Sequence, residues 1–84
     1  MLKATVIGRV WSSKRLEDMP AGPVLEVQVD DSSARLLAFD PLGCGDGEKV
    51  IIATGSVAAG WFKGKPPPID ALIIGSIDDA GAAT

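Results

Sequence analysis

The chain of 84 residues contains no histidine and no tyrosine, and it has a single cysteine, Cys44. Histidine is the commonest general base and metal ligand, and it usually activates a nucleophilic serine or cysteine. Its absence argues against most acid–base, metal-dependent and covalent catalysis. A lone cysteine also excludes an intrachain disulfide and is typical of a reducing cytosol.

Positive charge and aromatic rings are scarce as well. Eight lysines and arginines stand against eleven aspartates and glutamates, for a net charge of −3, beside two tryptophans and two phenylalanines. This balance argues against a surface built for phosphate backbones. The sequence shows neither a basic, apolar, cleavable leader nor an apolar run of membrane-spanning length. We therefore expect a cytoplasmic protein without nucleic-acid or membrane partners.

Apolar residues, in contrast, are abundant. Hydrophobic side chains make up 46% of the chain, and the mean hydropathy is +0.26. A domain of this size is near the lower limit for folding alone, and its interior cannot enclose so much apolar side chain. Part of the apolar surface is therefore expected to face another subunit.

A period of two dominates the hydrophobic pattern and predicts β-strands. In the first strand, alternate residues from Leu2 to Val10 share one face, and Gly8 is expected to mark a bend or bulge. The last two strands are apolar on both faces, which predicts that both faces are covered. The expected strands cover residues 2–11, 24–29, 35–39, 49–54 and 69–78.

A short helical turn is expected between the last two strands, over residues 55–62, with Ser56 as its N-cap and Gly60 as its terminator. The proline-rich stretch that follows predicts an irregular crossing. These elements predict a mostly β fold, a small, partly open five-stranded barrel of OB-like type with one short helical turn. We expect one domain over residues 1–79 and a flexible tail over residues 80–84.

The stretch DPLGCGDGEK, residues 40–49, has the glycines and the lysine of a phosphate-binding loop. A P-loop, however, places Ser or Thr after the lysine and opens a helix, whereas Lys49 precedes a predicted strand. The dinucleotide pattern also fails, because its third glycine would fall on Glu48. The glycines are therefore expected to supply positive φ angles or close backbone approach.

The same loop carries other candidates for chemistry. Asp40, Asp46 and Glu48 could surround a hard cation, but their spacing is not that of a calcium loop, so solvated turn carboxylates are favoured. Cys44 and Ser56 lack an activating histidine and are predicted to be unreactive. The sequence thus predicts no catalytic residue, no bound cofactor and no metal site.

Two lysines accompany the aromatic rings in WFKGK, residues 61–65. Stacking rings beside cations suit single-stranded nucleic acid on an OB-like barrel. A hydrophobic lid packed beside the prolines is the favoured alternative, because the chain is acidic and poor in aromatics. The residues that would carry nucleic-acid binding are Trp61, Phe62, Lys63 and Lys65.

Four stretches, taken together, resemble the EutN/CcmL family of bacterial microcompartment vertex proteins. They are ATVIGRVWSSKR, FDPLGCGDGEKV, GSVAAG and PIDALIIGSID, which occur in the family's order and spacing and place the resemblance over about residues 2–79. One departure is clear in the helical turn: Ala59 stands where the family has arginine, and Val57 replaces an alanine.

The resemblance implies a structural shell protein without enzymatic activity. Such a protein forms a homopentamer that caps the vertices of a polyhedral microcompartment, beside hexagonal shell proteins, and needs no cofactor. On this hypothesis the glycine loop lets five chains approach closely near a central axis or pore. A single-stranded nucleic-acid-binding module is the alternative, and an enzyme that uses Cys44 or the carboxylates is the least favoured function. The residues expected at a subunit interface or pore are Gly43, Cys44, Gly45, Asp46, Gly47, Gly55, Ser56, Val57 and Ala58.

Overall fold

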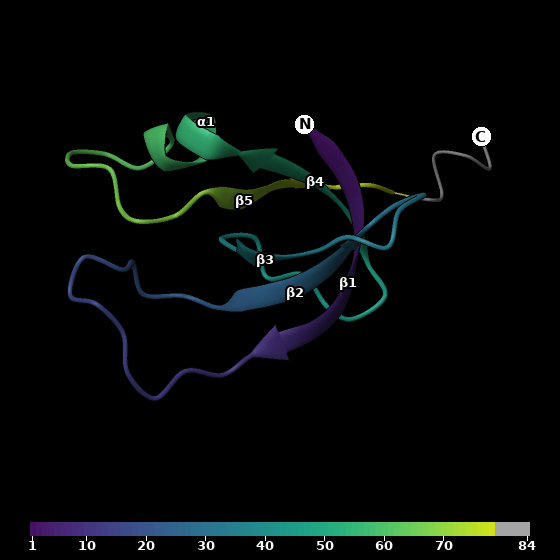
Figure 1. The fold of residues 1–84 in the computed structure, drawn as a ribbon, viewed down its shortest axis with the longest axis horizontal. Coiled ribbons are helices and arrows are strands. Elements are labelled where there is room, and N and C mark those ends of the chain that lie inside the picture. The colour runs from purple at the N-terminus through teal and green to yellow at the C-terminus, as the bar shows by residue number, and fades with distance from the viewer. Residues whose placement is uncertain (79–84) are drawn as a thin grey trace.

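A computed structural model describes residues 1–78 as five strands and one short helix (Figure 1). The predicted mostly β fold is confirmed, whereas the tail at residues 80–84 lies outside the described residues. No helix within residues 1–78 has the length and apolar character to cross a membrane. The elements are β1 (Leu2–Val10), β2 (Val24–Val29), β3 (Arg35–Phe39), β4 (Lys49–Thr54), α1 (Gly55–Gly60) and β5 (Ala71–Ser76).

The strands form a closed barrel in the order β1-β2-β3-β5-β4, so the expectation of a partly open barrel is wrong. Neighbouring strands are antiparallel except β3 and β5, which run parallel and pair only through Phe39 and Leu72. Residues 61–70 form the crossing that connects α1 to β5. β5 then pairs with β4 on one side and meets β3 on the other.

A β-bulge interrupts β1 between Val6 and Gly8, as the glycine predicted. Val6 pairs with Val27, but Gly8 pairs with Glu26 and Arg9 with Leu25. Because directly opposed residues share a face, the bulge turns Arg9 toward the side of the buried Leu25. The predicted alternation is therefore right as far as Val6 and wrong beyond it.

Two hydrophobic clusters stabilise the fold. One fills the barrel, and a second joins α1 and the crossing to the outer side of the β3–β5 pairing. Burial on both faces of β4 confirms the prediction for that strand. In β5, however, Ile74 is 44% exposed, because it is the extra residue of a second bulge. The barrel cluster comprises Ala4, Val6, Leu25, Val27, Ala38, Val50, Ile52, Ala71 and Ile73; the outer cluster comprises Phe39, Ala58, Ile69 and Leu72, with Met19, Val24 and Phe62 against it.

The start of α1 differs from the sequence prediction. Gly55, with a φ of 66°, turns the chain directly out of β4, and its N–H donates to the Asp70 carbonyl at 2.7 Å. The N-cap is therefore Thr54, which makes no side-chain cap bond, and Ser56 lies inside the first turn. Gly60 is the last helical residue, but Trp61 follows it in right-handed backbone geometry, so no left-handed glycine ends the helix.

We predict that Gly22→Ala lowers the free energy of unfolding by about 1–3 kcal/mol. A Cβ at Gly22 would lie 2.7 Å from Cζ of Phe39, and the glycine has a φ of 148°. Phe39 is 6% exposed and packs in the outer cluster, so any shift of its ring away from the new methyl group loses packing there. Urea unfolding at one fixed protein concentration measures the change.

Gly60→Ala is the matched control, since nothing lies within 4 Å of its added Cβ. Its stability should change by less than about 1 kcal/mol. Equal midpoints for the Gly22 variant and the wild type would contradict the packing of Phe39 over Gly22.

Candidate functional site: the glycine loop and two apolar faces

The glycine loop, residues 40–48, is anchored at its start by Asp40. This carboxylate is 2% exposed and accepts the N–H groups of Leu42, Gly43 and Cys44 at 3.0, 3.2 and 2.7 Å. The expectation of a solvated turn carboxylate is therefore wrong for Asp40. Aspartate commonly accepts such bonds from the turn that follows it, a signal that was present in the sequence.

Glu48 anchors the far end of the loop. One carboxylate oxygen accepts the Gly45 N–H at 3.0 Å, and the other accepts the Ser76 hydroxyl of β5. These two bonds, the Ser76 bond foremost, hold the pKa of Glu48 below its usual value. Backbone bonds join Gly47 and Glu48 to Val6 at 2.8 and 2.9 Å. The loop is thus fixed to both β1 and β5.

The three glycines serve different needs within one chain. Gly43 and Gly47 have φ values of 86° and 83°, so the predicted conformational role is confirmed for them. Gly45 has no positive φ, and nothing lies within 4 Å of a Cβ built on it. A single chain therefore gives no reason for glycine at position 45.

Lys49 is engaged in the barrel wall. Its ammonium group donates to both carboxylate oxygens of Asp30, at 3.2 and 3.1 Å, and the Thr5 hydroxyl donates to the same carboxylate at 3.1 Å. The bond from Lys49 is the main reason that the pKa of Asp30 is lowered. The lysine that suggested phosphate binding thus joins β4 to the end of β2.

Metal binding gains no support from the geometry. Within residues 1–78, no group of three His, Cys, Asp or Glu side chains is placed to hold a metal ion. Asp40 faces the backbone of its own loop, whereas Asp46 is exposed.

Cys44 lies at the middle of the loop and packs against the barrel cluster. Burial, followed by the negative charges of Asp40 and Glu48, raises the pKa of its thiol to about 11. A raised pKa disfavours the thiolate at neutral pH, so the low reactivity expected from the sequence stays a prediction for this thiol.

The loop borders a face that the sequence did not predict. Beyond the β1 bulge, the Arg9 guanidinium lies 4.8 Å from the ring centre of Trp11, which is 81% exposed. Arg9 and the loop enclose a hollow of about 280 Å³. We call the hollow together with Trp11, which contacts Arg9, the loop face. The hollow is lined by Arg9, Pro23, Leu25, Gly43, Cys44, Gly45 and Asp46.

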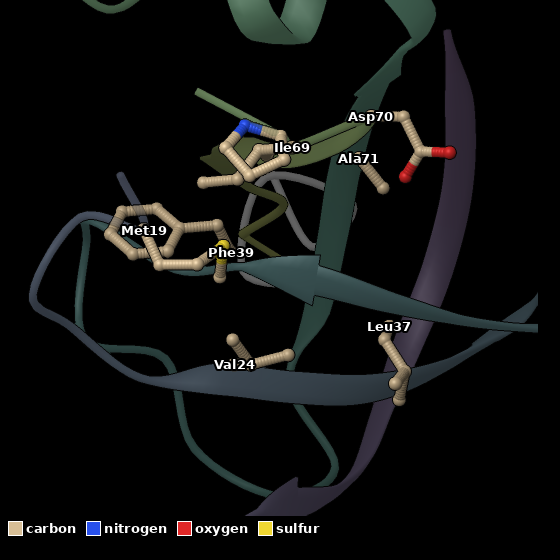
Figure 2. Close-up of a pocket in the computed structure, with 8 residues that line it drawn as sticks. Met19, Val24, Leu37, Phe39, Ile69, Asp70 and Ala71 are labelled. Atoms are coloured by element: carbon tan, nitrogen blue, oxygen red, sulfur yellow. The ribbon is translucent and has the colours of Figure 1, made fainter. Parts of the chain in front are cut away.

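A second hollow, of about 220 Å³, lies where β3 meets β5. Figure 2 shows Met19, Phe39 and Ile69 grouped at one end and Leu37 and the Asp70 carboxylate toward the other. We call it the seam hollow. A neighbouring hollow shares Phe39 with the seam hollow. A further hollow shares Pro41 and Trp61 with that neighbour and includes the exposed Leu42 and Ile74.

One of the two rings of the WFKGK stretch packs on the outer cluster, whereas the predicted packing beside the prolines stays a prediction. Phe62 packs edge-on against Phe39 and Trp61, with ring centres 5.5 and 5.1 Å apart. Trp61 remains 58% exposed. Because Phe62 belongs to the outer cluster, the WFKGK stretch offers one free ring rather than a stacking platform.

The expected interface residues fall into two separate groups. Cys44 packs on the barrel cluster, and the rest of its group forms the exposed turn of the glycine loop. In α1, by contrast, Ala58 is fully buried in the outer cluster. Gly55, Ser56 and Val57 are exposed on that helix. The structure therefore places the two groups on different clusters of the molecule.

These features define a small closed barrel with an anchored glycine loop and a surface hollow on each of two regions. The chain belongs to the EutN/CcmL family, which matches residues 1–78 under the description "Ethanolamine utilisation protein EutN/carboxysome". The resemblance inferred from the sequence motifs is thereby confirmed.

Similar proteins share both sequence and fold. The chain is 32% identical to the carboxysome shell vertex protein CcmL of Synechocystis, with 100% of this chain and 89% of that protein covered. It is 28% identical to the microcompartment shell vertex protein EutN of Salmonella typhimurium, with 98% and 88% covered. Among solved structures, the pentameric shell protein MSM0273 of the RMM microcompartment is 62% identical, with 95% and 93% covered and a TM-score of 0.91.

We predict that Asp40→Asn lowers the free energy of unfolding by about 1–3 kcal/mol. Both carboxylate oxygens accept N–H groups of the loop, and the amide NH2 that replaces one of them cannot accept a hydrogen bond. Thermal unfolding measures the change at fixed concentration. Asp31→Asn, an exposed change in the turn between β2 and β3, should alter stability by less than about 0.5 kcal/mol. Equal losses for both variants would contradict the anchoring role of Asp40.

We also predict slow alkylation of Cys44. A rise of its pKa from 9.0 to about 11 leaves about 100-fold less thiolate at pH 8. Iodoacetamide should therefore modify the native protein about 100-fold more slowly than the urea-unfolded chain, as followed by mass spectrometry. Similar rates in the two states would show that the folded loop does not suppress the thiolate.

Proposed function

We propose that this protein is a structural shell subunit whose homopentamers cap the vertices of a polyhedral bacterial microcompartment in the cytoplasm. The observation that carries the proposal is the match to a pentameric microcompartment shell protein, at 62% identity and with a TM-score of 0.91. Two curated relatives with the same role, EutN and CcmL, support it. The role is architectural and requires no chemistry from the chain.

The distribution of apolar surface supports a ring of subunits. A ring of identical copies is built from one head-to-tail contact, so each copy must present two different surfaces. The loop face and the hollows along the β3–β5 seam are two such surfaces. The large hydrophobic side chains that the isolated chain exposes are Met1, Ile7, Trp11, Leu16, Leu37, Leu42, Val57, Trp61 and Ile74.

We place the glycine loop in the contact between copies. Its anchors at Asp40 and Glu48 give it a fixed shape before assembly, which lowers the entropy lost on binding. Gly45, for which one chain gives no reason, leaves room for the backbone of a neighbour. The exposed residues of α1 from Gly55 to Val57 form part of the opposite side of the contact.

Hexagonal shell proteins are the proposed neighbours of the pentamer. Ala59 replaces the arginine that the family motif carries in α1, so a polar contact made by that arginine is not available here. Neutral residues instead dominate the exposed part of α1, which has no acidic residue in its first turn and no basic residue in its last.

The native mass of the purified protein tests the proposal. Five copies of the 8.6 kDa chain should give a particle of about 43 kDa in native mass spectrometry or light scattering. A monomer that persists over a wide concentration range would overturn the proposed function.

A variant of the loop sharpens this measurement. Gly45→Leu should shift the particle toward smaller species, because the added side chain occupies the space assigned to a neighbour. Ser33→Leu adds a side chain in the exposed turn between β2 and β3 and serves as the control. Unchanged pentamers for the Gly45 variant would remove the glycine loop from the contact.

A further inference from the structure

Arg9 and Trp11 form a cationic and aromatic unit that has no partner in the described chain. The guanidinium lies 4.8 Å from the ring centre, and both side chains are exposed. Within residues 1–78, the ion pairs join other residues, and Arg9 is in none of them. Asp46 lines the same hollow as Arg9, but the two form no ion pair.

The seam hollow has the complementary character. Its wall is apolar, with Leu37 54% exposed, and Asp70 supplies its single charged group. The backbone carbonyl of Asp70 accepts the Gly55 N–H, whereas its exposed carboxylate has no ion pair in the part of the chain that the structure describes. An apolar hollow with a carboxylate at one end suits an aromatic ring that has a cationic side chain stacked beside it.

The barrel order separates these two features. β1 lies two strands from β3 through β2, and two strands from β5 through β4. The seam is therefore as far around the barrel from β1 as five strands allow. In addition, the bulge turns Arg9 to the inner side, whereas Leu37, paired with Glu26, lies on the outer side. Within one chain the Arg9 side chain and the Leu37 wall of the hollow therefore face different sides of the barrel wall, and a second copy can bring the two features together.

We propose that the ring contact seats Trp11 of one copy in the seam hollow of the next copy, with Arg9 paired to Asp70. This inference rests on the proposed function, since it assigns the contact within the pentamer. A second copy of this chain is the occupant because the Arg9–Trp11 unit supplies both the apolar ring and the opposite charge. A polyanion is disfavoured as the occupant, because Asp70 repels phosphate.

Disulfide trapping tests the contact. Cysteines are placed beside Trp11 and on the wall of the hollow, as Ser12→Cys and Leu37→Cys, in a Cys44→Ser background. Leu37 lies on β3, which is two strands around the barrel from β1, and a link within one chain would run at the position of the monomer on the gel. Oxidation should then give a ladder of linked species up to five copies on a non-reducing gel.

Mixing the two single-cysteine proteins provides the control for direction. Each contact can then link one Ser12→Cys chain to one Leu37→Cys chain, so no species larger than two copies is expected. A native mass of five copies without any linked species would overturn this contact and leave the proposed function intact. A native mass other than five copies would overturn both.

Charge reversal provides a second readout that does not depend on disulfide geometry. Arg9→Asp and Asp70→Arg should each raise the concentration at which the ring dissociates at least tenfold, and the double variant should recover most of that loss. Lys63→Asp, an exposed change elsewhere, should have no such effect. A double variant as weak as the singles would contradict the pairing of Arg9 with Asp70.

Discussion

The fold depends on one residue at the closure of the barrel, Phe39. Its backbone makes the single parallel pairing with Leu72 that joins β3 to β5. Its ring lies in the outer cluster, edge-on to Phe62, and against the backbone of Gly22. The same ring lines two of the hollows along the seam. Closure of the barrel, attachment of α1 and the shape of the outer surface therefore all involve Phe39, the first through its backbone and the other two through its ring.

Most of the fold could be predicted from the sequence, because alternation of apolar residues depends on local spacing alone. All five strands and the helical turn lie where the pattern indicated: three strands have the expected ends, and the other elements differ by at most two residues at either end. The errors concentrate where a strand adds a residue. Arg9 follows one bulge, and Ile74 occupies another. Gly8 indicated the first bulge, but the residues that change face depend on the register with the partner strand.

The candidate site was less accessible to prediction. The local chemistry of Asp40 could have been found, since aspartate before a glycine turn often accepts backbone bonds. The start of α1 could not, because the Asp70 carbonyl that receives the Gly55 N–H comes from a distant segment. The seam hollow joins residues from Met19 to Ala71 and exists only once the barrel closes.

The single pairing between β3 and β5 has a consequence for the free subunit. Within residues 1–78, β3 pairs along its length with β2, and β5 with β4, but each meets the other at one residue only. The β3–β5 closure is therefore the shortest ladder of the barrel and the place where the sheet is least protected against insertion of another strand. On the proposed arrangement, a ring that covers the seam also shields this short closure, so assembly protects each subunit as well as completing the particle.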